Sequence, residues 1–271
     1  MTRHLVVAVV VALLLSACGG GSGLSDTVPP DPEVAVLTVT SEGGFSAPDS
    51  RVSAMPRYVV GADHTLYFQG PVPEIFPGPL LPNIQVVKLS DQTWKDILAV
   101  VAELGMPDYV EKLDDEGADQ VADAGTDVII YHDANGDHRL AIYALGITNG
   151  SASPDRLLAT DLMQILDDAA FNSESQPFSP ETLQVAAGDA GLDVGPGMAT
   201  VQPWPLDVAY ADMTGWIAGW RCVEVGGPKV PDLMDTFGNA NQATLWDTGS
   251  EQVNLRVVPL MPGRQACPAN P

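Results

Sequence analysis

Hydrophobic residues form three patterns along the chain: one unbroken apolar run, segments with helical spacing, and short strand-like segments. The unbroken run covers residues 5–15, follows Arg3 and ends in small residues before Cys18. A membrane-spanning helix needs about 20 apolar residues, so this run is too short to cross a bilayer. A basic start, a short apolar stretch and small residues are the parts of a signal peptide. The pattern therefore predicts that residues 1–17 are a signal segment.

Three later segments have apolar residues three and four positions apart, which indicates amphipathic helices over 90–104, 154–170 and 231–239. Ser90 and Ser153 stand where N-caps are expected. Segments rich in β-branched and aromatic residues indicate strands, often joined by Gly-containing turns. The predicted strands cover residues 34–40, 57–60, 65–68, 84–89, 127–131, 139–145, 183–186, 219–225, 243–246 and 252–258.

These elements predict an α+β fold with a mainly antiparallel sheet and helices packed on one face. Residues 71–82 hold five prolines and are predicted to be a loop, as are the acidic residues 111–127. The order strand, helix, hairpin occurs in residues 84–145 and again in 219–258. The body, residues 33–271, is therefore interpreted as one unit or as two similar halves, 33–150 and 151–271.

Leu15-Ser16-Ala17-Cys18 is similar to the lipobox of bacterial lipoprotein signal peptides. Processing of such a segment attaches diacylglycerol to the cysteine thiol and cleaves before it, and further acyl chains such as palmitate make the anchor stable. The polar, Gly-containing residues 18–32 have no face to bury and are expected to be a flexible tether. We therefore expect a protein held on the extracytoplasmic face of the cell membrane through Cys18.

Charge narrows the class of partner. The chain has 12 basic and 35 acidic residues, a net charge of −23. Removal of residues 1–17 takes away only Arg3, which leaves 11 basic and 35 acidic residues and a net charge of −24. Such an acidic body argues against nucleic acid as a partner. The remaining candidate partners are an envelope protein, a wall polymer and a small ligand.

Cysteine use predicts one disulfide. With Cys18 lipidated, Cys222 and Cys267 remain. Two cysteines in an exported body most simply form one bridge, which here would tie back the end of the chain.

The segment His132-Asp133-Ala134-Asn135-Gly136-Asp137-His138 holds the candidate metal ligands, namely His132, His138, Asp133 and Asp137. A two-residue turn at Asn135-Gly136 would pair Asp133 with His138 and place the histidines on opposite faces. A three-residue loop, 134–136, would pair His132 with His138 on one face. Only the second register lets both imidazoles bind one divalent metal ion. A solvated turn with no ligand is the competing interpretation.

Several short motifs stand in order along the body: Gly43-Gly44-Phe45, Leu66-Tyr67, Pro77-Gly78-Pro79, Val121-Ala122-Asp123-Ala124, Tyr143-Ala144-Leu145-Gly146, Arg221-Cys222, Trp246 and Val258-Pro259-Leu260-Met261-Pro262. Together with the lipobox, this order resembles a family of uncharacterised exported lipoproteins of actinobacteria. The family pattern near the end is Arg-Pro-Leu-Leu-Pro, and Val258 stands here in the arginine position. No activity is established for that family, so the resemblance implies location and the disulfide but no mechanism.

The hypothesis from sequence is a lipid-anchored binding or interaction module at the cell envelope, with no cofactor. The alternative is an envelope metal-dependent hydrolase that uses the 132–138 segment. The chain lacks Gly-x-Ser-x-Gly, His-Glu-x-x-His and Ser-x-x-Lys motifs. Whether it is an enzyme is left open.

Overall fold

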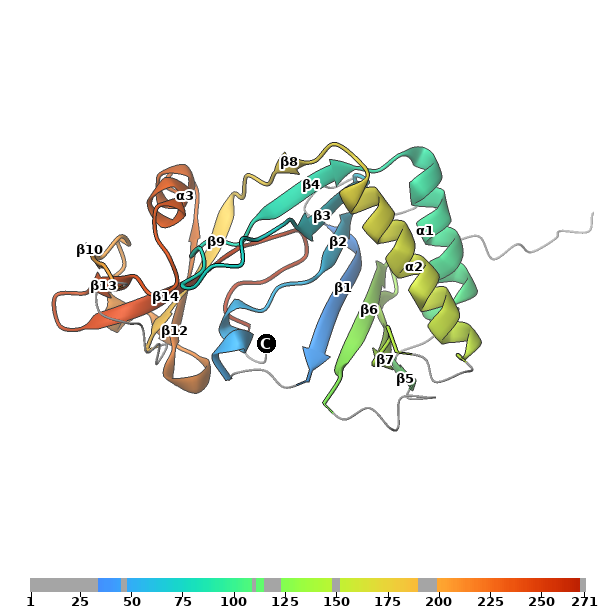
Figure 1. Cartoon of the computed structure of the whole chain (residues 1–271), viewed down its shortest axis with the longest axis horizontal. Helices are drawn as coiled ribbons and strands as arrows, with labels where there is room; N and C mark the ends of the chain where they lie inside the picture. Colours follow the sequence, from blue (N-terminus) through green and yellow to red (C-terminus); the bar gives the residue numbers. More distant parts are fainter. Residues whose placement is uncertain are drawn as a thin grey trace, which may run out of the picture.

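The computed structural model describes residues 34–44, 48–108, 111–114, 123–147, 152–189 and 199–268. The predicted signal segment, the tether and the lipidation site Cys18 lie outside the described residues. The described chain forms two sheets, one with eight strands and one with six (Figure 1). None of the helices described is long and apolar enough to cross a membrane.

The first sheet is antiparallel except at one edge, where β5 runs parallel to β7. Its strand order is β5-β7-β6-β1-β2-β3-β4-β8. The strands are β1 (Ala35–Gly43), β2 (Tyr58–Gly61), β3 (Thr65–Gln69), β4 (Ile84–Lys88), β5 (Glu111–Asp114), β6 (Gly125–Asp133), β7 (Gly136–Tyr143) and β8 (Gln176–Pro177).

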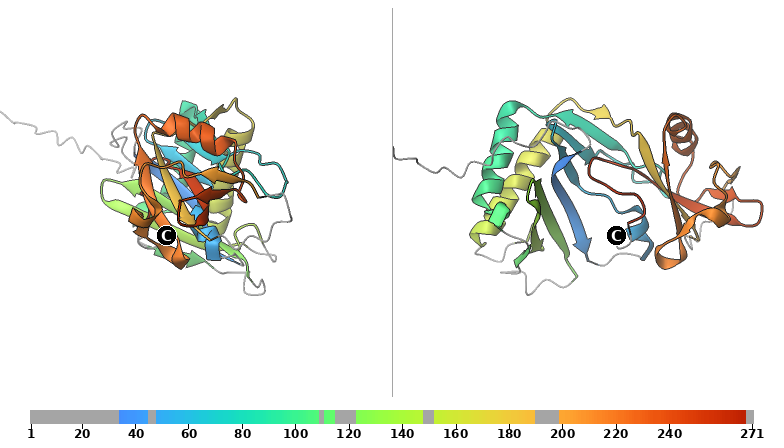
Figure 2. Two further views of the ribbon diagram at one scale, coloured as in Figure 1. Left: turned by 90° about the vertical axis from the view of Figure 1, so that its left-hand side faces the viewer. Right: turned by 180° about the vertical axis from the view of Figure 1, so that it is seen from behind.

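Two helices, α1 (Asp91–Glu103) and α2 (Pro154–Phe171), lie side by side on one face of this sheet (Figure 2). Their apolar stripes and the facing strands share one large core of buried side chains. Both helices begin as expected, because the side chains of Ser90 and Ser153 accept hydrogen bonds from the first turn.

A polar contact also joins α2 to the sheet. The Tyr58 hydroxyl of β2 donates to Asp167, and Arg57 forms an ion pair with the same carboxylate at 3.0 Å. Burial and the hydrogen bond to Asp167 raise the pKa of Tyr58 to about 12. This side of α2 is therefore fixed by a buried phenol as well as by apolar packing.

The second sheet has the order β10-β13-β14-β9-β12-β11. Its strands are β9 (Thr182–Gly188), β10 (Val201–Pro203), β11 (Thr214–Gly215), β12 (Arg221–Gly226), β13 (Leu245–Asp247) and β14 (Gln252–Pro259). The helix α3 (Val230–Gly238) covers one face, where Phe237 meets Trp246 edge to face at 5.8 Å. This sheet therefore has its own core.

Three segments join the two sheets. A short 3-10 helix, Pro48–Ser53, packs against the second sheet through Val52. The proline-rich loop, residues 71–82, meets the end of α3, where Leu80 N–H donates to Ala240 O at 3.2 Å. Residues 260–268, which we name the strap, run from β14 back toward the first sheet (Figure 1). Met261 of the strap packs on the face of the first sheet that the helices leave free.

The α+β class with mainly antiparallel sheets is confirmed. The order strand, helix, hairpin is present in both parts, but the hairpins differ. In the first sheet the earlier hairpin strand, β6, lies beside β1, whereas in the second the later one, β14, lies beside β9. The short edge strand β5 falls in a segment predicted to be a loop, and the short edge strand β10 lies outside the predicted strands.

The boundary between the parts also differs from the expected one at residue 150. The helix α2 and the strand β8 both belong to the first sheet, because α2 packs against α1 and β8 pairs with β4. The physical reason is burial: the apolar face of α2 completes the first core. The change of sheet therefore falls after Pro177.

Replacing Leu162 by Ala should lower the free energy of unfolding by roughly 2–5 kcal/mol, because this side chain is fully buried (0 % exposed) between α2 and the first sheet. Leu157 on the same helix is 55 % exposed, and its replacement by Ala should change stability by less than about 0.5 kcal/mol. Urea unfolding followed by circular dichroism compares the two. Equal losses would contradict the packing described.

Candidate functional site

The turn between β6 and β7 adopts a register that neither sequence alternative predicts. Asp133 pairs with Gly136 and His132 with Asp137, so the turn residues are Ala134 and Asn135. The Asp133 carboxylate explains the difference, because it accepts the Asn135 N–H at 2.7 Å and closes the turn one residue early. Gly136, with φ of 125°, becomes the first residue of β7.

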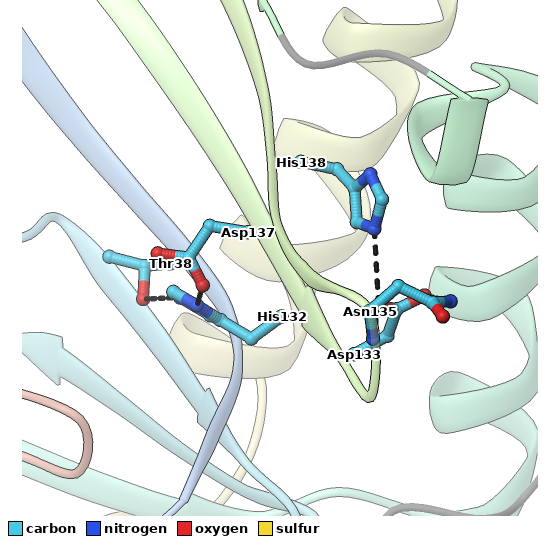
Figure 3. Close-up of polar contacts among 6 residues, drawn as sticks. All are labelled: Thr38, His132, Asp133, Asn135, Asp137 and His138. Carbon is cyan, nitrogen blue, oxygen red and sulfur yellow. Dashed lines mark hydrogen bonds and ion pairs between the residues drawn. The ribbon is translucent and has the colours of Figure 1, made fainter.

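This register places the two histidines on opposite faces of the hairpin (Figure 3). One metal ion therefore cannot be bound by both imidazoles. In the described part of the chain, no three His, Cys, Asp or Glu side chains are grouped so that they could hold a metal ion. The four predicted ligands instead form two separate pairs, one on each face.

The pair on the helix side is His138 with Asp133, joined at 3.1 Å and largely buried. Burial alone would raise the pKa of Asp133, but hydrogen bonds from the Asn135 backbone and from His138 outweigh it and lower the pKa. The carboxylate thus both closes the turn and holds the imidazole.

The pair on the other face is His132 with Asp137, whose Nδ1 and Oδ1 atoms are 2.6 Å apart. The second ring nitrogen, Nε2, lies 3.2 Å from Oγ1 of Thr38 on β1 (Figure 3). The three side chains come from three neighbouring strands and form one hydrogen-bonded chain.

A cavity of about 810 Å³ lies farther along this face, between the two sheets. The end of β1, the 3-10 helix, β9 and the strap all contribute to its wall. Its polar and charged lining residues are Thr40, Ser41, Glu42, Arg51, Gln184, Arg264 and Gln265, with Trp216 as the large apolar surface. We call this space the inter-sheet cavity.

Arg264 projects from the strap and lines this cavity and also a second one of about 830 Å³. Among the described residues its guanidinium gives one hydrogen bond, from Nη2 to Ala54 O at 3.2 Å, and its backbone N–H donates to Met261 O at 3.1 Å. Burial lowers the pKa of its guanidinium, but an arginine stays charged at neutral pH. Four of the five guanidinium donor hydrogens therefore have no partner among the described hydrogen bonds.

The predicted disulfide is confirmed: Cys222 of β12 and Cys267 of the strap are bonded, with Cα atoms 5.7 Å apart. Two further contacts hold this end of the strap. Cys267 N–H donates to Gln184 Oε1 at 2.9 Å, and Trp216 Nε1 donates to Pro268 O at 2.7 Å.

The strap also meets β1 closely at Gly263, which has φ of 72°. A Cβ atom there would lie 2.9 Å from the Cβ of Ala35. Only glycine fits both the left-handed backbone and this approach. The strap is therefore fixed at two points, one on each sheet.

Comparison with known proteins adds no relative. No protein-family model matches the chain, and neither curated proteins nor solved structures give a match. The fold and the site geometry therefore stand as the basis for any statement about function.

Sequence reasoning missed Thr38 and Arg264. Thr38 alternates with buried residues in a strand, a common pattern that carries no chemical signal. Arg264 follows Pro262-Gly263, and this turn signal could have drawn attention to it. The cavity that it lines depends on how two sheets meet, which the local pattern does not specify.

Replacing both Cys222 and Cys267 by Ser should lower the free energy of unfolding by about 4 kcal/mol, as expected for a bridge that closes a 45-residue loop. The strap should also exchange amide hydrogens faster, because its end is then held only by hydrogen bonds. Urea unfolding and hydrogen exchange measure the two effects. Unchanged exchange in residues 260–268 would contradict the clamping role.

Proposed function

We propose that the protein is a lipid-anchored binding protein on the extracytoplasmic face of the cell membrane, and that it holds a small organic anion in the inter-sheet cavity. The observation that carries the proposal is the position of Arg264. Its guanidinium is partly desolvated at the cavity wall and uses one donor atom in described hydrogen bonds. Arginine donors in such a setting suit the planar carboxylate group or a phosphate.

Size and lining support a small molecule. Ligand pockets commonly measure roughly 300–1,000 Å³, and the inter-sheet cavity is about 810 Å³. The lining combines hydroxyl and amide groups with the Trp216 ring. Polar groups fix the orientation of a ligand, and the aromatic ring covers its apolar part.

Charge supports an anion of small size. Arg51 and Arg264 both line the cavity, while the chain as a whole carries a net charge of −23. A long polyanion would be repelled by the net negative charge of the chain. A compact anion meets the two arginines and one carboxylate, that of Glu42, which forms an ion pair with Arg139 at 2.8 Å.

Residues 18–32, which the sequence predicts to be a tether, suit such a role at a membrane. Fifteen extended residues reach about 50 Å at most, and a flexible chain of this length spans less on average. The body would remain near the bilayer and still be free to turn. A solute-capturing protein needs this access to the surrounding fluid.

Arg264→Gln should abolish the stabilisation that a bound anion provides. In a thermal melt series with citrate, inorganic phosphate and glucose 6-phosphate, a ligand at 100 times its Kd raises Tm by roughly 5–10 °C. The shift should vanish in Arg264→Gln and persist in Lys229→Gln, which removes an exposed cation at a distance from the cavity. An anion that stabilises both variants equally would refute the cavity as its site. No stabilisation by any of these anions would count against the proposal.

Cys18→Ser should move the protein from the membrane fraction to the soluble fraction, because the thiol that carries the lipid is lost. Detergent partitioning of cells that express each form, with an immunoblot of both phases, measures this. Ser16→Thr is the matched control and should keep the protein in the detergent phase. A Cys18→Ser protein that still partitions into detergent would contradict lipid anchoring at this residue.

A further inference from the structure

Thr38, His132 and Asp137 are linked in the order hydroxyl, imidazole, carboxylate on the face of the first sheet away from the helices (Figure 3). The distances along the chain are 3.2 Å and 2.6 Å. The same order of groups, at such distances, activates the nucleophile in serine hydrolases on several unrelated folds. Sheet pairing alone produces it here, since the three residues lie on β1, β6 and β7.

The Asp137 carboxylate determines which nitrogen of the His132 ring carries the hydrogen. A carboxylate can only accept a hydrogen bond, so His132 Nδ1 must donate to it. The other nitrogen of the neutral ring, Nε2, is then an acceptor and receives the Thr38 hydroxyl hydrogen. This is the arrangement that a general base needs before it takes a proton from a nucleophile.

A substrate can reach these groups. The His132 side chain is 26 % exposed and that of Asp137 70 %, and Thr38 is half-buried. Residues two apart in a strand point to the same face, so Thr38 lies on the face on which Thr40 lines the inter-sheet cavity. Thr38 thus shares a sheet face with a residue of the cavity wall, although it does not itself line the cavity, and it is not fully buried.

The second histidine pair serves as an internal comparison. His138 and Asp133 have the same ion-pair chemistry, but they lie on the helix side and are largely buried. The described hydrogen bonds give His138 no hydroxyl partner. A nucleophile is therefore present in one pair and absent from the other.

We propose that Thr38 is a nucleophile toward small activated carboxylic esters, with His132 as its general base and Asp137 as a positioning residue. Thr38 Oγ1 attacks the carbonyl carbon and its proton passes to His132 Nε2. The ester C–O bond then breaks, and the leaving alcohol takes that proton. Water attacks the acyl-Thr38 ester, His132 accepts a proton from the water and returns it to Thr38, and the acid is released.

The geometry also limits the rate. Thr38 lies between Val59 and Ile130 in the sheet. The backbone N–H groups of its strand are engaged in strand pairing and therefore do not point at the position of an oxyanion. Solvent around Asp137 further weakens the field on the imidazole. We therefore expect slow turnover of phenyl esters and no cleavage of peptide bonds.

The test measures the hydrolysis of p-nitrophenyl acetate by the full chain. Mass spectrometry of its peptides then shows which residue carries the acetyl group. After reaction, the protein without substitutions should carry an acetyl group on Thr38. The part of the hydrolysis rate that depends on Thr38 should fall by roughly 100-fold or more in His132→Gln. Thr38→Val should remove both acetylation at this position and that part of the rate, whereas Thr38→Ser should retain them. His138→Gln should be acetylated on Thr38 and should hydrolyse the ester at the same rate as the protein without substitutions.

The Asp137→Asn variant tests whether Asp137 positions the His132 ring for catalysis or only supports the fold. The amide of asparagine can donate to Nδ1 and favour the ring tautomer with hydrogen on Nε2, which cannot accept the Thr38 proton. Nitrogen-15 NMR of the His132 ring should show this change, and the rate should fall with Tm nearly unchanged.

The proposal is overturned if Thr38→Val, shown to be folded by its thermal melt, hydrolyses the ester at the original rate. It is also overturned if the acetyl group is found only on other residues. It does not rest on anion binding, since the probe carries no anionic group.

Discussion

The strap holds the two sheets at a fixed spacing, and the inter-sheet cavity exists because of it. At one end Met261 is buried on the free face of the first sheet, and at the other Cys267 is bonded to β12. A sheet that presents one covered and one uncovered apolar face would otherwise collapse onto a neighbour or expose that face. A segment without regular structure thus determines how much space remains between two regular layers.

One buried amide makes this spacing specific. Gln184 of β9 donates from Nε2 to Val52 O of the 3-10 helix and accepts from Cys267 N–H at Oε1. Both ends of the amide are used, so its orientation is determined, and neither partner can shift without leaving a buried polar group unpaired. Apolar packing brings the layers together, and this side chain fixes their relative position.

Sequence pattern predicted most of the elements and little of their arrangement. Helical spacing and caps located α1 and α2, since each helix buries a single stripe and begins at a serine. The assignment of α2 to the first sheet could not be read from the chain, because it depends on which core its stripe completes. The disulfide was predictable, since setting Cys18 aside as the expected lipidation site leaves only Cys222 and Cys267 to pair.

The hairpin shows why the site was harder to predict. Asn135-Gly136 is a strong turn signal, but the Asp133 carboxylate bonds the Asn135 N–H and shifts the turn by one residue. The turn still has two residues, so the histidines stay on opposite faces, as a turn at Asn135-Gly136 would also place them, but the partner of His132 becomes Asp137. The balance between an aspartate hydrogen bond and the freedom of a glycine is a matter of about 1 kcal/mol, too small to read from residue types alone.

Arg264 borders two cavities at once, and this shared wall has a consequence for stoichiometry. A guanidinium turned toward one space withdraws its donors from the other. Two anions of the same kind would therefore compete for one side chain although they occupy different volumes. Under the proposed anion binding, occupancy of either space would disfavour occupancy of the other, and by thermodynamic linkage the penalty would be equal in both directions. The body is then expected to carry one anion at a time, with the strap as the divider.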